Sequence, residues 1–185
     1  MPPVARAPRS HEPVCSIERC LQILSDRWSF LILREALFSG VTRFADFERK
    51  LGIAPNVLTD RLESLVDAGV LTRRAYQVPG SRTRFSYHPT PAGHDLAMPL
   101  AALQQWGDEH NPPPAGPTVV RRSAAGKAVR VGFLDEGDQA VPASDVVFVK
   151  TAAHPDITPD GACFARTSST TAATRRLGAP GAIST

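Results

Sequence analysis

Four arginines with no acidic neighbour mark the part of the chain that is best suited to binding an anion. Residues 73–93 have the sequence RRAYQVPGSRTRFSYHPTPAG, which contains no aspartate or glutamate. The whole chain has a formal charge of only +3, from 21 lysines and arginines against 18 acidic residues. Guanidinium groups bind phosphate through paired N–H donors, so the cluster predicts a phosphate-rich partner. The alternative is that an exposed hairpin needs the charge for solubility and to discourage edge pairing.

Cys15 is the one candidate for covalent chemistry. A thiol near the start of a helix can have a lowered pKa and become reactive, but a single cysteine on an apolar helix is more often a small buried hydrophobic residue. Cys20 follows five residues later, about 140° around the helix, so we expect no intrahelical disulfide. The three cysteines include no CxxC pair, which indicates free thiols in a reducing compartment.

Motifs for catalysis or for metal binding are missing from the sequence. It contains no nucleophile elbow, phosphate-binding loop or convincing carboxylate pair, and its five histidines lack the spacing of metal ligands. We therefore expect no enzymatic activity, no cofactor and no metal site.

A β-hairpin is predicted to position the arginines. The stretches LTRRAYQV and RTRFSYH alternate as strands do, and Pro79-Gly80-Ser81 lies where the chain must turn. The alternation places Phe85 and Tyr87 on one face. It places a second, mostly basic set on the other face, namely Arg82, Arg84, Ser86 and His88.

Two short helices are predicted just before the hairpin. Phe44, Phe47 and Leu51 share one face of the first helix, residues 52–54 form a tight turn, and Pro55 begins the second. The second helix spans about residues 55–68, and its apolar stripe is Val57, Leu58, Leu62, Leu65 and Val66. This pair is typical of a helix-turn-helix, whose second helix presents its N-terminal side chains to the DNA major groove. Ala54 leaves that helix without a side-chain cap.

Helices are also predicted on either side of this unit. Ile17, Cys20, Leu21 and Leu24 have helical spacing, and Asp26 can cap a following helix. A last helix begins after Thr90, and Pro99 should kink it. Its apolar residues lie on more than one side, which favours burial against a second subunit; burial within the chain is the alternative.

Composition divides the chain into five regions. Residues 1–13 are expected to be a flexible arm, residues 14–110 the main domain, and residues 111–117 a Pro-rich linker. Residues 118–150 suggest a small strand-rich extension around the turn-forming DEGD, and residues 151–185 a low-complexity, flexible tail. The chain has no apolar run of the roughly 20 residues that span a membrane and no secretory signal, so we expect a cytoplasmic protein.

The central region resembles the HxlR-type winged helix-turn-helix transcriptional regulators of bacteria. The resemblance runs from Cys15 to about Gly107, through CSIERCLQIL, DRW, RFADFERKL, IAPNVLTDRLESLVDAGVL, TPAG and PLAALQQWG. It implies a mainly α (α+β) fold with one winged helix per subunit and with N-terminal and C-terminal helices that form a homodimer. Some members carry paired cysteines in a C-terminal extension, but residues 112–162 contain none here, which puts a zinc site in doubt.

The resemblance also implies roles for individual residues. We expect DNA contacts from Arg43, Pro55, Asn56, Thr59, Arg61, Arg73, Arg82 and Arg84. We expect the dimer interface to include Ile17, Leu21, Leu96, Leu100, Leu103 and Trp106. Cys15 occupies the position at which certain relatives respond to oxidants or electrophiles, so it is the candidate thiol sensor.

Together these patterns predict a sequence-specific transcriptional regulator that binds double-stranded DNA as a homodimer. Regulators in such families are more often repressors. The helix at about 55–68 would enter the major groove of a palindromic operator, and the wing at about 71–88 would lie on the backbone or in the minor groove. The protein would then be nucleoid-associated while bound, and a small-molecule or oxidant effector could control it. The alternative is a winged helix that binds another protein and has only non-specific affinity for DNA.

Overall fold

The computed structural model describes residues 15–24, 26–77, 80, 82–151 and 153–154. The predicted arm and nearly all of the predicted tail therefore lie outside the described residues. The chain divides into two compact units, one up to Val131 and one from Gly132. The helices and strands of the first unit follow in the order α1 (Ser16–Ile23), α2 (Arg27–Phe38), α3 (Phe44–Leu51), α4 (Pro55–Asp67), β1 (Leu71–Tyr76), β2 (Arg84–Pro89), α5 (Pro91–Asp95) and α6 (Ala97–His110).

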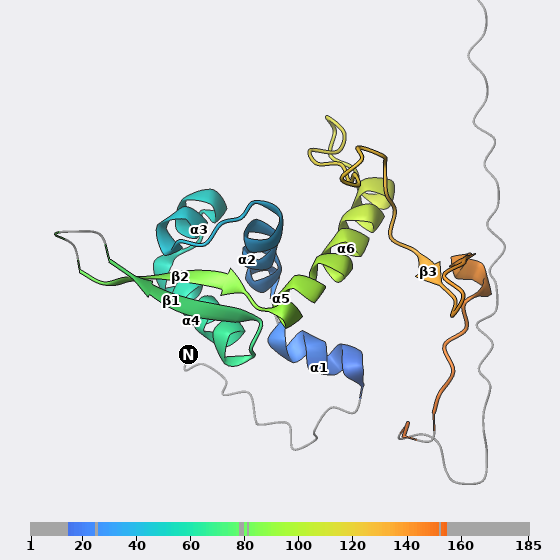
Figure 1. Cartoon of the computed structure of the whole chain (residues 1–185), viewed down its shortest axis with the longest axis horizontal. Helices are drawn as coiled ribbons and strands as arrows, with labels where there is room; N and C mark the ends of the chain where they lie inside the picture. Colours follow the sequence, from blue (N-terminus) through green and yellow to red (C-terminus); the bar gives the residue numbers. More distant parts are fainter. Residues whose placement is uncertain (1–14, 25, 78–79, 81, 152, 155–185) are drawn as a thin grey trace, which may run out of the picture. The chain divides into compact units, whose positions relative to one another are not determined.

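Helices α2, α3 and α4 form the core of the first unit (Figure 1). Their inward side chains are fully buried, namely Ile32, Leu33, Phe47, Leu58, Leu62 and Leu65. The predicted capping of α2 is confirmed, because the Asp26 carboxylate accepts hydrogen bonds from the N–H groups of Trp28 and Ser29 at 2.7 and 3.1 Å. This cap fixes where α2 begins, and the buried stripe fixes which face it turns inward.

The predicted helix-turn-helix is confirmed in α3 and α4. Gly52 ends α3 with a φ of +60°, a left-handed conformation that glycine adopts without steric cost. Helix α4 then begins at Pro55, and Ala54 provides no side-chain cap, as expected. Gly69 ends α4 with a φ of +70°. There the N–H groups of Gly69 and Val70 donate to the carbonyl oxygens of Val66 and Leu65, a pattern that directs the chain into β1.

The wing is an antiparallel pair in which Leu71 lies opposite Pro89 and Tyr76 opposite Arg84. A short third segment, which the sequence did not predict, joins its edge. Arg43 forms a bridge with Ser86, and the Tyr87 N–H donates to the Thr42 carbonyl oxygen at 2.7 Å. The residues just before α3 thus hold the wing against the helix-turn-helix.

The last helix is divided rather than kinked. Helix α5 ends at Asp95 and α6 begins at Ala97, so the break lies at Leu96, three residues before Pro99. Pro99 has no N–H to donate to the carbonyl of Asp95, and its ring would clash with that carbonyl in a continuous helix. In the first turn of a new helix neither problem arises. Thr90 caps α5, as predicted, by accepting a hydrogen bond from the Gly93 N–H at 3.1 Å.

Residues 118–131 belong to the first unit, and hydrogen bonds and an ion pair connect them to α6. Gln104 donates to the Val119 carbonyl oxygen at 2.8 Å, and the Gln105 side chain exchanges two hydrogen bonds with the backbone of Val131. Arg121 forms an ion pair with Asp108 at 3.1 Å. The chain after the linker therefore packs back along the helix.

The second unit is less regular than its sequence predicts. Its strands are the two-residue β3 (Phe133–Leu134) and β4 (Ala140–Val141), which pair around the predicted DEGD turn. The stretch SDVVFV, which lies within the predicted strand-rich extension, begins with the end of a 3-10 turn (Ala143–Asp145) and then has no regular structure. Val147 and Phe148 are exposed, and an apolar run without a neighbouring strand cannot complete a ladder. In the described part of the chain, no helix is long and apolar enough to cross a membrane.

Candidate nucleic-acid interface

The N-terminus of α4 is open to solvent. Pro55 and Asn56 are exposed, and Ala54 places no side chain over the first N–H groups of the helix. Thr59 is half-buried, and its hydroxyl donates to the Pro55 carbonyl oxygen at 2.9 Å. The unpaired N–H groups at a helix start can bind a phosphate oxygen, and Asn56 can reach a base edge beside them.

Arg61 is turned back into the protein. Its Nε lies 2.6 Å from Oδ2 of Asp26, the residue that caps α2, although the N–H is not aligned as a hydrogen bond. Both side chains are about one third exposed, at 32% and 28%. This pair ties α4 to the start of α2. The predicted contact of Arg61 with DNA would require this ion pair to open.

Two carboxylates extend the exposed face of α4. Asp60 and Glu63 are exposed, one and two turns along the helix from Asn56. Helical spacing places both outside the apolar stripe of α4, but the sequence alone gives no reason to rank them as DNA contacts. Carboxylates can accept from the amino group of cytosine in the major groove, whereas they repel phosphate.

The wing divides its arginines between two faces. Register places Arg74 and Arg84 on one face, together with Tyr76. Arg43, bridged to the same sheet, lies with its guanidinium carbon 5.3 Å from the Tyr76 ring centre, a cation–π contact. Arg82, just before β2, is exposed.

Arg73 occupies the opposite face. Its guanidinium carbon lies 4.4 Å from the centre of the Phe85 ring, which explains how a 40% exposed phenylalanine is partly covered. Of the two residues predicted on the apolar face, only Tyr87 is buried. Burial raises the pKa of Tyr87, with Arg73 opposing the rise and Glu63 adding to it. Arg73 thus faces α4 and its acidic residues, unlike the other wing arginines.

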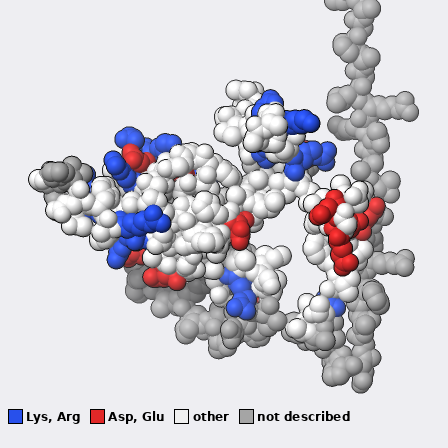
Figure 2. Space-filling model, viewed as in Figure 1, with Lys and Arg blue, Asp and Glu red and all other residues white. Residues whose placement is uncertain are grey.

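Several cations elsewhere in the winged helix have carboxylate partners. Arg49 pairs with Asp46 at 2.6 Å, and Lys50 pairs with Glu35 at 3.2 Å. Within the described residues, no carboxylate comes within ion-pair distance of the arginines at positions 43, 73, 74, 82 and 84. Figure 2 shows basic side chains over α3 and the wing, with acidic ones along α4. The wing and its edge therefore carry a group of arginines that no intrachain carboxylate neutralises in the described structure.

The residues expected at a dimer interface differ in their exposure in the single chain. Ile17 and Leu21 on α1, and Leu103 and Trp106 on α6, are exposed, with exposed fractions between 52% and 71%. Leu100 is buried in the core of its own chain and Leu96 packs against that core, so these two are covered without a second subunit.

The described cysteines are both exposed. Cys15 lies at the start of α1, and neither it nor Cys20 is in a disulfide. The reading of Cys15 as a small buried hydrophobic residue is therefore wrong for the single chain. Cys163 lies outside the described residues. Across the ranges that the structure describes, no group of three or more His, Cys, Asp or Glu side chains could hold a metal ion.

Comparison with known proteins identifies the family. Residues 23–114 match the model of the HxlR-like helix-turn-helix. The HTH-type transcriptional regulator Rv3095 of Mycobacterium tuberculosis is 43% identical over 107 residues, which are 58% of this chain and 66% of that protein. The chain thus matches just under two thirds of that relative's length. The HTH-type transcriptional regulator YtfH of Escherichia coli K12 is 36% identical over 93 residues, 50% of this chain and 71% of that protein.

A solved structure supports the same assignment. The structure of PA1607, assigned as a transcription factor, superposes with a TM-score of 0.63 at 32% identity and covers 74% of this chain and 95% of that one. Because residues 1–114 make up only about three fifths of the chain, a match of that extent continues beyond the winged helix. The chain belongs to the HxlR-like helix-turn-helix family of DNA-binding transcriptional regulators.

Proposed function

We propose that this regulator binds a palindromic operator as a homodimer and represses the adjacent gene. The observation that carries the proposal is the set of exposed arginines at the wing, positions 43, 74, 82 and 84, which have no intrachain carboxylate in the described structure. Unneutralised guanidinium groups and an open helix N-terminus both favour binding to the negatively charged DNA backbone.

Base recognition falls to α4 in this proposal. Its first turns enter the major groove, where Asn56 can form two hydrogen bonds with adenine. The wing then lies along the phosphates or in the neighbouring minor groove. Contacts with phosphate give affinity and orientation, while the side chains of α4 give sequence preference.

Dimerisation would use the exposed apolar residues of α1 and α6. Ile17 and Trp106 are 71% and 62% exposed, which is unusual for such large apolar side chains and favours burial against a second subunit. Two winged helices related by a two-fold axis read half-sites about 34 Å apart, one turn of DNA. An operator that overlaps a promoter is then blocked when the dimer is bound.

The decisive experiment is selection of bound fragments from genomic DNA by the purified full chain at low and at higher salt. An enriched inverted repeat with half-sites one helical turn apart supports the proposal, and placing that site before a reporter gene tests repression. If DNA is retained only at low salt and no sequence is enriched, the proposal of a sequence-specific regulator is refuted. The alternative, a module that binds another protein, is then supported.

The dimer needs its own test. Ile17→Ser combined with Leu21→Ser should halve the mass measured by light scattering and weaken operator binding. Arg19→Ser on the same helix is the matched control, because it changes an exposed charged side chain and leaves Ile17 and Leu21 in place. A wild-type chain that is monomeric at micromolar concentration would refute the dimer.

A further inference from the structure

A cavity of about 640 Å³ lies between α2 and α6, away from the wing and the start of α4. Ligand pockets in proteins have volumes of about 300–1,000 Å³. Large apolar side chains form much of its wall, namely Phe30, Leu31, Phe38, Leu100, Leu103 and Val119. Phe38 and Leu103 are also about half exposed, so the single chain leaves their surfaces uncovered.

The polar groups of the cavity are largely paired with one another. Glu35 accepts from Arg34, Asp108 pairs with Arg121, and Gln104 donates to a backbone carbonyl. A ligand that carried several polar groups would have to break these pairs, which favours a ligand whose surface is mostly apolar.

Arg34 is the one cation on the cavity wall in the described structure. The wall also carries two carboxylates, Glu35 and Asp108, and both already have cationic partners. Glu35 pairs with Arg34 and Lys50, and Asp108 pairs with Arg121. An anionic group on the ligand would therefore find its favourable charged partner on this wall in Arg34.

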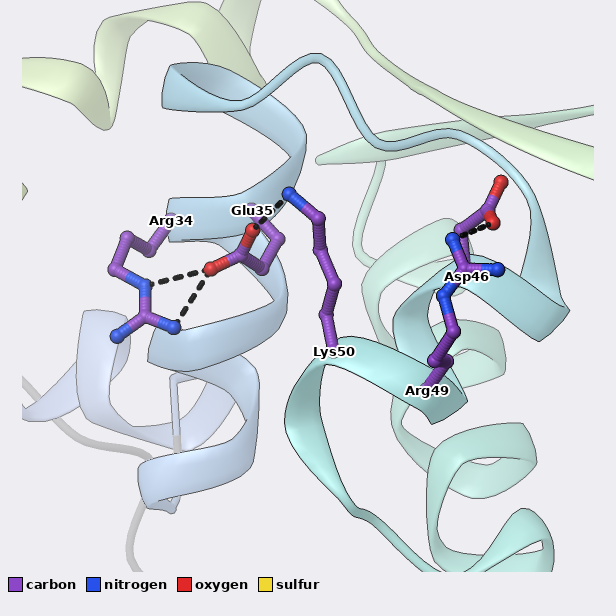
Figure 3. A network of polar contacts seen from close by, with 5 residues as sticks. All are labelled: Arg34, Glu35, Asp46, Arg49 and Lys50. Carbon is purple, nitrogen blue, oxygen red and sulfur yellow. Dashed lines mark hydrogen bonds and ion pairs between the residues drawn. The ribbon is translucent and has the colours of Figure 1, made fainter.

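The Arg34 side chain can bind the anionic group of the ligand. Its Nε and Nη2 donate to a single oxygen, Glu35 Oε1, at 3.0 and 2.7 Å (Figure 3). Its remaining N–H groups have no acceptor in the described structure, and its side chain is 47% exposed on the cavity wall. A guanidinium has five N–H donors in one plane, so the same side chain can hold Glu35 and a second anion.

We propose that the cavity between α2 and α6 binds a small, mostly apolar monoanion, such as an apolar carboxylic acid, whose anionic group binds Arg34. The bound molecule would also be connected to the helix-turn-helix through hydrogen bonds of the cavity wall. The other oxygen of Glu35 accepts from Lys50 of α3 at 3.2 Å, so one buried carboxylate links the cavity wall to the first helix of the helix-turn-helix (Figure 3). The role of the ligand as an effector rests on the proposed function, whereas its binding does not.

The test compares two fluorescent probes that differ in charge. Anilinonaphthalene sulfonate is an aromatic monoanion, and phenylnaphthylamine has the same aromatic skeleton without the sulfonate. Both are titrated into the full chain without DNA. Arg34→Gln should weaken binding of the sulfonate by about tenfold, because a charge-assisted hydrogen bond is lost, and leave binding of the neutral probe within about twofold.

Three matched variants locate the site. Arg34→Lys keeps the charge and should retain most of the sulfonate binding. Arg49→Gln is the control, since Arg49 also pairs with one carboxylate but lies on α3 outside the cavity. Thr118→Phe places a ring into the cavity from an exposed wall position and should weaken both probes.

The proposal is overturned if the wild-type chain saturates with neither probe, as would happen if a partner subunit filled the cavity. It is also overturned if Arg34→Gln and Arg49→Gln bind the sulfonate equally, or if Thr118→Phe changes neither affinity. A chain that binds the sulfonate through Arg34 but selects no DNA sequence would refute the proposed function and leave the anion site standing.

Discussion

Loss of the two arginines that flank the start of β2 should change how DNA binding depends on salt. Arg82 and Arg84 are exposed and have no intrachain ion pair in the described structure, so each is available to one phosphate. Each phosphate contact contributes about 0.9 to the slope of log K against log salt. The double variant Arg82→Ala, Arg84→Ala should therefore have a slope shallower by about 1.8.

The consequence is a specific pattern of affinities. Over a fourfold rise in salt, from about 50 to about 200 mM, the wild-type affinity should fall by about tenfold more than that of the double variant. The assay is fluorescence anisotropy of a labelled operator duplex at four or more salt concentrations. The preferred base sequence should not change, because phosphate contacts carry no direct sequence information.

Two controls separate this mechanism from a general loss of charge. Arg122→Ala with Arg130→Ala removes the same charge from outside the winged helix and should leave the slope unchanged. Arg73→Ala should have a smaller effect than either wing arginine, because that guanidinium stacks on Phe85 on the face toward α4. A double variant whose slope equals that of the wild type would refute the wing as a phosphate contact.

Substitutions at four further positions test this surface and the elements that hold it in place. Asp26→Ala should destabilise the fold by about 2 kcal/mol in chemical denaturation, because it removes the cap of α2, whereas Asp26→Asn keeps the cap and should cost less. Gly93→Ala should destabilise by about 1–3 kcal/mol and lower the midpoint of a thermal melt, because the new Cβ would overlap the backbone carbonyl of Val70. Burial opposes ionisation of Glu35, but hydrogen bonds from its neighbours outweigh burial and lower its pKa. Glu35→Gln should therefore cost about 1–2 kcal/mol at neutral pH, and this difference should vanish as the pH falls below the ordinary value of 4.5 and through the lowered pKa of the folded state. Asp60→Asn should raise affinity for random duplex DNA and relax selection at one base of the selected site, and an unchanged selection would show that Asp60 does not face the groove.

The helices and the wing could be predicted from the sequence because their signals are local. The stripe on α4 and the glycine after α3 act within a few residues, and so does the cap of α2. The split of the last helix was harder to place. Proline predicts a disturbance, but the break occurs one turn earlier, at Leu96, because the missing donor of Pro99 affects the carbonyl of Asp95.

Contacts between distant residues could not be predicted in this way. The sequence places Arg61 on α4, but only the packing of α2 against α4 brings it to Asp26. Alternation places Arg73 and Arg74 on opposite faces, but it does not say that Phe85 lies beyond the core and needs a cover. The edge segment before α3 has no strand pattern because it contributes only one bridge.

In the proposed DNA-binding surface, these distant contacts give α4 and the wing different roles. Helix α4 exposes the carboxylates of Asp60 and Glu63, and its one arginine is held by Asp26. Beyond its first turn, the exposed side chains of α4 would therefore repel phosphate, and in the proposed complex they would favour DNA only where they find matching bases. The wing would supply the sequence-independent attraction that these side chains lack. The carboxylates of α4 would repel the phosphates of any DNA sequence equally. A mismatched site would lose the base contacts but keep this repulsion, so the difference in binding free energy between operator and random DNA would become larger.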